Sequence, residues 1–207
     1  MGEQEDPRVT RSRGRILESA RTVFLREGYL GTTLDQVAVE SGVAKRTIYN
    51  LYADKDDLFR ATILSAIEIA DRFAASIAAD VVEVDSVEDL PSIAERLAEA
   101  TLLGPALPLR RLLVMESRRF PDLVSEYRRR APEAVMSALS ELFRRAGRAG
   151  SLDIRDPRLA AEHFAFLIMG ADLDRGMFTG QHPPRTAVTA LARDGAEAFL
   201  RAYRVSD

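Results

Sequence analysis

Two side chains four residues apart, Arg46 and Asn50, have the hydrogen-bonding groups needed to read base-pair edges. An arginine guanidinium can form paired hydrogen bonds with guanine, and an asparagine amide can do the same with adenine. Residues four apart point to the same side of an α-helix. Lys45, Thr47 and Tyr49 lie beside them and could hold phosphate or sugar. If this segment is helical, its outer face predicts contact with double-stranded DNA.

The segment that carries these residues is predicted to be a short helix, from about Ala44 to Leu51. On a helical wheel, Ala44, Leu51, Ile48 and Tyr52 fall on the side opposite to Arg46. Because so short a helix is marginal by itself in water, this inner side must pack against neighbouring helices. The outer side is then free to bind a partner. A solvated face that binds nothing is the alternative, and residue types alone make it the more common one.

The chain before this helix predicts two partner helices and a tight turn. Apolar periodicity indicates a first helix over residues 10–27, which should end at Gly28, where a positive φ is tolerated. Thr33 is a typical N-cap for a second helix over residues 34–40. Gly42 makes the turn into the next helix. Together these elements predict a small three-helix head.

Basic residues near the head add support for a nucleic-acid partner. Asp54 is expected to cap a fourth helix, and Lys55 at its start could meet a phosphate beside the free amide groups of the helix end. A basic run leads into the first helix. It contains Arg8, Arg11, Arg13 and Arg15, and no acidic residue interrupts it. We expect Arg11, Arg13 and Lys55 to contact DNA, with binding that weakens as salt is added.

Composition limits the remaining classes of function. Of 207 residues, 46% are hydrophobic and 29% are charged, which is typical of a soluble globular protein. The net charge of −3 means that any DNA binding comes from a local patch. The absence of cysteine excludes disulfides, thiolate zinc sites and cysteine nucleophiles. With no signal segment and no apolar run long enough to span a bilayer, we expect a cytoplasmic protein with no membrane partner.

The rest of the chain is also predicted to be helical, because no strand-like alternation is convincing. A long helix should run to about Ala79 and be followed by a loop near residues 82–91. Further helices are expected at about 91–103, 109–120, 121–147 with an interruption at Pro132, 157–178 and 185–204. We place the division between a DNA-binding domain, 1–56, and a helical domain, 57–207, with residues 1–9 as a disordered tail.

The head resembles a known family. TTLDQVAVESGVAKRTIYNLYADKDDLF, with the upstream RILESARTVFLREGYLGTT, is similar to the helix-turn-helix of the TetR/AcrR family of bacterial transcriptional regulators, over about residues 12–62. The resemblance implies an all-α, TetR-like fold. It departs from the common pattern at Ala44, where many members have serine, and at Leu51, where histidine is frequent. It implies phosphate contacts by Thr33 and Lys55 and a recognition surface of Lys45, Arg46, Thr47, Tyr49 and Asn50.

The last two helices predict a homodimer. Residues 164–171 are apolar on every side of a helix, and the last helix has a broad apolar stripe with small residues. One small domain has too few neighbours to cover both, so a symmetric partner is the simple solution. Packing wholly within one chain is the alternative. The expected interface residues are Phe164, Ile168, Ala171, Leu191, Gly195 and Phe199.

The family resemblance further implies a repressor that binds a pseudo-palindromic operator and is released by a small molecule bound in the body. A shift of the long fourth helix would carry the signal to the head. A largely apolar effector is expected from the candidate lining residues. These are Phe73, Ile77, Met115, Phe120, Tyr127, Met136, Phe143, Phe166 and Met169. Each of them could equally be plain core, and a helical regulator or interaction protein without an effector stays an alternative.

Catalysis is the main alternative from another class. The chain has two histidines, His163 and His182, no phosphate-binding glycine loop and no nucleophile motif. Asp172 and Asp174 are two apart on a helix, so their carboxylates diverge. His163 is interpreted as a core or interface residue and His182 as a loop residue. We expect no enzyme activity, no metal and no cofactor.

Overall fold

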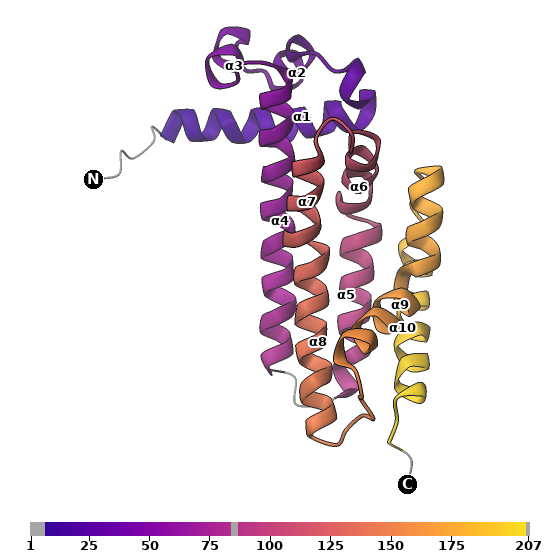
Figure 1. Ribbon diagram of the computed structural model, residues 1–207. Coiled ribbons are helices and arrows are strands. Elements are labelled where there is room, and N and C mark those ends of the chain that lie inside the picture. The colour runs from indigo at the N-terminus through magenta and orange to yellow at the C-terminus, as the bar shows by residue number, and fades with distance from the viewer. Residues whose placement is uncertain (1–6, 84–86, 206–207) are drawn as a thin grey trace, which may run out of the picture. The chain divides into compact units, whose positions relative to one another are not determined.

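Helices are the regular elements of the residues that the computed structural model describes, which are 7–83 and 87–205 (Figure 1). The all-α fold predicted from the sequence is confirmed. The helices are α1 Pro7–Gly31, α2 Leu34–Ser41, α3 Lys45–Leu51, α4 Lys55–Glu83, α5 Leu90–Leu102, α6 Ala106–Met115, α7 Pro121–Arg130, α8 Pro132–Arg148, α9 Pro157–Thr179 and α10 Arg185–Ala202. A short 3-10 turn, Val87–Asp89, precedes α5.

The chain divides into two compact units, and α4, α6 and α7 each have residues in both. The first unit comprises residues up to Glu68 together with Leu112–Ser125. The second comprises Ile69–Arg111 and the chain from Glu126 onward. The first unit therefore reaches beyond residue 56 and includes a segment that is distant in sequence from the helix-turn-helix.

The core of the first unit is built around aromatic rings. Phe24 of α1 and Phe59 of α4 are fully buried, with ring centres 5.0 Å apart and nearly perpendicular. Tyr29 lies 5.2 Å from Phe59 in the same edge-to-face arrangement. Phe120 stacks on Phe59 at 4.7 Å. Such pairs contribute about 0.5–1.5 kcal/mol each beyond the area that they bury, so Phe120 ties the 112–125 segment to α1 and α4.

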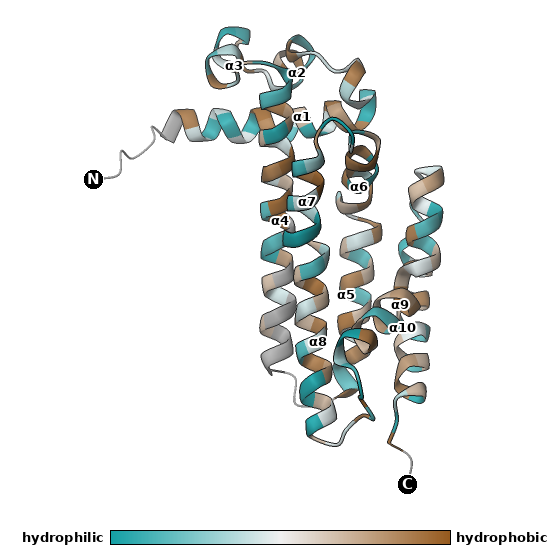
Figure 2. Cartoon of the chain, viewed as in Figure 1, coloured by the Kyte–Doolittle hydropathy of each residue, from teal (hydrophilic) through white to brown (hydrophobic). Residues whose placement is uncertain are grey.

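The core of the second unit is formed by α5, α8, α9 and α10. Phe143, Phe164 and Phe199 are each 0% exposed and contact one another with ring centres 4.7–5.5 Å apart. Gly195 lets α10 approach α9 closely, because a Cβ there would lie 2.6 Å from the carbonyl oxygen of Leu167. The apolar residues of these helices, brown in Figure 2, thus pack mainly within the chain itself.

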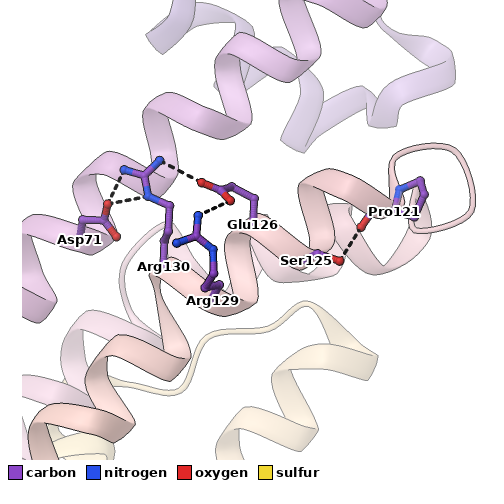
Figure 3. A network of polar contacts seen from close by, with 6 residues as sticks. All are labelled: Asp71, Pro121, Ser125, Glu126, Arg129 and Arg130. Atoms are coloured by element: carbon purple, nitrogen blue, oxygen red, sulfur yellow. Dashed lines mark hydrogen bonds and ion pairs between the residues drawn. The ribbon is translucent and has the colours of Figure 1, made fainter.

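Hydrophilic residues dominate the end of α7 (Figure 2), where a polar network joins α7 to α4 within the second unit. Arg130 donates from Nε to Asp71 at 2.8 Å and from Nη1 to Glu126 at 3.4 Å (Figure 3). Arg129 donates to Glu126 at 2.5 Å and is the main cause of the lowered pKa of that carboxyl. The side chains of Arg130 and Asp71 are both half-buried. The pair should therefore contribute more to stability than an ion pair that is fully exposed to water.

One expected helix is shorter in the structure, and another is interrupted where the sequence predicted an interruption. The helix expected over 109–120 ends at Met115, and the amides of Arg119 and Phe120 both donate to the carbonyl of Glu116 in a turn. Pro121 disfavours helical geometry for the residue before it. The interruption expected at Pro132 is confirmed: the segment forms two helices, separated at Ala131 just before Pro132.

Candidate nucleic-acid interface

Helix α3 has one buried side and one exposed side. Ile48 is 0% exposed and Tyr52, which follows the helix, is 4% exposed. Arg46 and Asn50 are exposed on the other side, and Tyr49 is 50% exposed. Among the described residues, the side chains of Arg46 and Asn50 make no hydrogen bond or ion pair with the rest of the chain. Their donors and acceptors are therefore available to a partner in the way the sequence predicts.

The expectation that Ala44 lies on the inner side of α3 is wrong. Ala44 is exposed and stands at the N-cap, with ψ of 133°, so it lies outside the helical repeat on which the wheel was drawn. It provides no side-chain cap. Val43, which is 9% exposed, takes the inner position instead. Leu51 and Thr47 are half-buried at the edges of the helix.

Helix α2 and the turn after it set the position of α3. Thr33 and Gln36 form a reciprocal capping box, with Gln36 N donating to Thr33 Oγ1 at 3.2 Å and Thr33 N donating to the Gln36 side chain at 2.7 Å. Gly42 ends α2 with φ of 62°, a left-handed conformation that glycine adopts without strain. Arg15 of α1 donates to the carbonyl of Ser41 at 2.6 Å and so braces this turn. The sequence indicated Arg15 only as part of a basic run.

The positive charges around α3 differ in how far they are already neutralised. Lys45 pairs with Asp35 of α2 at 2.7 Å, and this hydrogen bond raises the pKa of Lys45. Arg11 and Arg13 are exposed on α1, and Thr33 is exposed at the start of α2. A phosphate would have to compete with Asp35 for Lys45. The side chain of Arg46 forms no ion pair with a carboxylate among the described residues, so it can bind a partner without breaking one.

The start of α4 is capped as predicted. Asp57 N donates to Asp54 at 2.8 Å, and Ala53 N donates to the Asp57 carboxylate at 3.1 Å. Lys55 is half-buried and held by two contacts: its Nζ lies 4.6 Å from the centre of the Tyr29 ring and donates to the carbonyl of Leu30 at 3.3 Å. Lys55 thus begins α4 in a fixed position.

An anchor that sequence reasoning missed lies beside Lys55. The hydroxyl of Tyr29 donates to Asp56, and Arg119 donates to both oxygens of the same carboxylate at 3.1 and 3.2 Å. The hydrogen bond from Tyr29, with help from Arg119, holds the pKa of Asp56 below its usual range. Burial, followed by the bond to Asp56, raises the pKa of Tyr29 to about 12. No short sequence pattern predicts this cluster, because 63 residues separate Arg119 from Asp56.

The residues expected to line a ligand pocket differ widely in burial. Met115 is 65% exposed and Phe166 is 70% exposed, while Phe120 belongs to the first unit and Phe143 is fully buried core. Apolar character alone does not tell which face a side chain takes. Of the remaining candidates, Tyr127 and Met169 are buried, Phe73 and Met136 are partly buried against the core of the second unit, and the side chain of Ile77 lies outside the described residues.

The expected dimer residues are mostly used inside the chain. Phe164, Ile168 and Phe199 are 0% exposed in the core of the second unit, and Gly195 packs against the backbone of α9. Ala171 is exposed and Leu191 is half-buried. The exposed apolar face of α9 is instead formed by Leu159, Phe166, Leu167 and Phe178, which are 45, 70, 42 and 82% exposed. Most of the residues expected at the interface thus face the core of the second unit, and the dimer interface itself stays a prediction.

The residues considered for catalysis make ordinary structural bonds. His163 Nδ1 lies 2.7 Å from the hydroxyl of Tyr203, and His182 Nδ1 lies 2.7 Å from the carbonyl oxygen of Leu102. Asp172 is buried and pairs with Arg175. Over residues 7–83 and 87–205, no three histidine, cysteine or acidic side chains gather as a metal site would require. Within the same ranges, every helix is too short or too polar to cross a bilayer.

A capped helix, a glycine turn and a second helix with an exposed basic face define a helix-turn-helix DNA-binding protein. Residues 16–62 match the family model "Bacterial regulatory proteins, tetR family", and residues 88–205 match "AefR-like transcriptional repressor, C-terminal domain". The chain belongs to the TetR family of transcriptional regulators. Both the fold and the family are those of transcriptional regulators rather than enzymes.

Solved structures and one curated relative agree with this family. A putative TetR-family transcriptional regulator from Mesorhizobium loti MAFF303099 is 26% identical, with a TM-score of 0.84 over 97% of this chain and 100% of that one. The flavonoid-responsive regulator FrrA is 25% identical, with a TM-score of 0.66 over 96% of this chain and 100% of its own. The uncharacterized HTH-type transcriptional regulator YfiR of Bacillus subtilis (strain 168) is 33% identical over 67 residues, 30% of this chain and 33% of YfiR. The chain thus spans about a third of the length of this curated relative.

Proposed function

We propose that the protein is a cytoplasmic repressor that binds a pseudo-palindromic operator as a homodimer and releases it when a small, largely apolar molecule binds. The observation that carries the proposal is the division of α3. Ile48 is fully buried, while Arg46 and Asn50 are exposed without partners among the described side chains. A short helix that packs on one side and carries groups able to hydrogen-bond base edges on the other can bind in the major groove.

The neighbouring residues would set the register of α3 on the duplex. Thr47 and Tyr49 flank the base-reading pair, and Thr33 lies exposed at the start of α2. Lys45 would exchange Asp35 for a phosphate, and Lys55 would hold the backbone at the start of α4. With Arg11 and Arg13 of α1, these contacts carry little sequence information but make binding depend on salt.

The exposed apolar face of α9 supports dimerisation. Phe166, Leu167 and Phe178 are large apolar side chains on one side of a helix whose other side is already buried. Such patches on soluble proteins mark interaction surfaces. We propose that a second copy covers this face, with Ala171 and Leu191 at its margin. Two recognition helices would then reach half-sites about 34–36 Å apart, one turn of DNA.

Repression and release rest on the second unit. The family model that matches residues 88–205 describes AefR-like transcriptional repressors, and FrrA, whose structure is similar, is named as flavonoid-responsive. Helix α4 has residues in both units, so it is the element through which a change in the second unit would reach Lys55. An apolar or aromatic effector suits a unit whose interior is lined with phenylalanine and leucine.

Selection from a random-sequence duplex pool by the purified protein tests the DNA-binding part. We expect enrichment of one sequence with approximate two-fold symmetry and half-sites about one turn apart. Enrichment of no sequence would contradict the proposal, and enrichment of a single unsymmetrical site would contradict the dimeric mode of binding. Release of the selected duplex is then measured against flavonoids and a panel of other small, largely apolar molecules. Insensitivity to all of them would favour a regulator that works without such an effector.

A further inference from the structure

The ammonium group of Lys55 is held by an aromatic ring and a backbone carbonyl, and not by a carboxylate. Its Nζ lies 4.6 Å from the centre of the Tyr29 ring and donates to Leu30 O at 3.3 Å. An ammonium group has three donors, so two remain for a phosphate oxygen. This geometry leaves the positive charge of Lys55 unneutralised, although Asp56 is its immediate neighbour in the chain.

The carboxylate of Asp56 is already held by Arg119 and Tyr29. Arg119 Nη2 lies 3.1 and 3.2 Å from the two carboxylate oxygens, and the Tyr29 hydroxyl donates to one of them. The guanidinium of Arg119 also lies 4.7 Å from the centre of the Tyr29 ring. Arg119, which lies 63 residues after Asp56 in the chain, thus contacts both the Asp56 carboxylate and the Tyr29 ring.

Arg119 is itself held in place by its neighbours. Its backbone amide donates to Glu116 O at 3.0 Å in the turn after α6. The next residue, Phe120, is 1% exposed and packs 4.7 Å from Phe59. All of these residues belong to the first compact unit. The turn therefore fixes the backbone of Arg119 at a position from which its side chain reaches Asp56.

We propose that Arg119 is a positioning residue for DNA binding: by occupying Asp56 it keeps the ammonium group of Lys55 free for a phosphate. The inference rests on the proposed function, because it gives Lys55 the phosphate contact assigned there. Without Arg119, the Asp56 carboxylate loses the guanidinium that donates to it, while Arg60 still acts on it electrostatically, and the long side chain of Lys55 can turn to pair with it. That pairing would withdraw Lys55 from the duplex, so a residue outside the helix-turn-helix sets the affinity of the head.

A double-mutant cycle between Arg119 and Lys55 tests the proposal, with the duplex selected by the wild-type protein as the probe. Affinity is measured by fluorescence anisotropy over a series of KCl concentrations for the wild type, Arg119→Gln, Lys55→Ala and the double variant. We expect each single variant to bind about 5–10-fold more weakly. The slope of log K against log[salt] should fall by about 0.9 for each phosphate that the protein no longer neutralises. The double variant should bind no more weakly than Lys55→Ala alone.

Additive effects of the two substitutions would overturn the proposal, because they would mean that Arg119 contacts DNA itself or acts on the fold in general. Arg119→Lys, which keeps the charge but not the forked geometry, should restore part of the affinity. Arg128→Gln is the matched control, since Arg128 is exposed on α7 and pairs with Glu133; it should bind as the wild type does. Thermal unfolding of every variant identifies any weakening that comes from misfolding. Because the side chain of Arg119 is 50% exposed, we expect Arg119→Gln to fold.

Two outcomes separate this inference from the function on which it rests. If the wild type selects no duplex at all, the proposed function fails. If the wild type selects a duplex but Lys55→Ala binds it with unchanged affinity, the function stands and the positioning role of Arg119 is refuted. Asp56→Asn offers a second route, since it removes the charge that could capture Lys55. In that background Arg119→Gln should cost little.

Discussion

The outer faces of α3 and α9 are both exposed in the single chain, yet they differ in chemistry. On α3 the exposed side chains are polar, with Arg46 and Asn50 free of partners within the described chain. On α9 they include several large apolar side chains among the polar ones, with Phe166 70% and Phe178 82% exposed. The first face suits a polar partner read through hydrogen bonds, and the second suits a partner that removes apolar surface from water. We therefore propose DNA as the partner of the first face and a second copy of the chain as the partner of the second.

The two faces also differ in how well sequence reasoning located them. Helix α3 mixes apolar and polar residues, so the burial of Ile48 determines which side remains outside. Residues 164–171 of α9 are apolar all round, and a pattern without a polar side cannot say which side faces the core. Phe164 and Ile168 were therefore expected at an interface, and they fill the core instead. Phe166, expected in a pocket, is exposed.

The largest expected effect is on the α9 face. Phe166→Asp places a charge where a partner subunit should bury an aromatic ring, so we expect a monomer at micromolar concentration. Because a single head then contacts one half-site, affinity for the selected duplex should fall by about 100-fold or more. Sizing with light scattering and anisotropy measure the two effects. Val114→Asp, at an apolar α6 position that is 56% exposed, is the control; a dimeric Phe166→Asp protein would refute the assignment of this face.

A smaller effect is expected at the turn that presents the α3 face. Gly42 has φ of 62°, and a Cβ there would lie 3.0 Å from Nη2 of Arg15. Gly42→Ala should lower the free energy of unfolding by about 1–2 kcal/mol, as measured by urea denaturation. Gly14→Ala is the matched control, because Gly14 lies within α1 with no atom near its Cβ position. It should raise stability by about 0.5–1 kcal/mol. Equal effects of the two substitutions would contradict this account of the turn.

The smallest effect concerns alkaline pH and the anchor beneath the DNA-binding face. The pKa of Tyr29 is raised from 10.0 to about 12, so the folded state holds this proton more tightly than the unfolded chain does. The resulting stability is complete below pH 10 and is lost as pH rises towards about 12. Tyr29→Phe should therefore lose less stability than the wild type over that range. Parallel curves of unfolding temperature against pH would show that Tyr29 does not contribute in this way.

Several local signals in the sequence were reliable, whereas contacts between distant segments were not visible. Gly28 and Gly42 adopt positive φ, and Thr33 and Asp54 cap the helices that they were expected to cap. Each of these features depends on a few neighbouring residues. The attachment of Arg119 to Asp56 depends on two segments 63 residues apart, and nothing in either segment alone indicates the other.

The central claim is that the outer face of α3 reads DNA sequence, and the double variant Arg46→Ala, Asn50→Ala tests it most directly. We expect an unchanged circular dichroism spectrum and a loss of affinity for the selected duplex of about 100-fold or more, since each base pair that is read contributes about 1–3 kcal/mol. Weak, salt-dependent binding to any duplex should remain. Arg118→Ala, which removes an exposed arginine elsewhere in the first unit, should bind as the wild type does. Wild-type affinity and sequence preference in the double variant would contradict the claim.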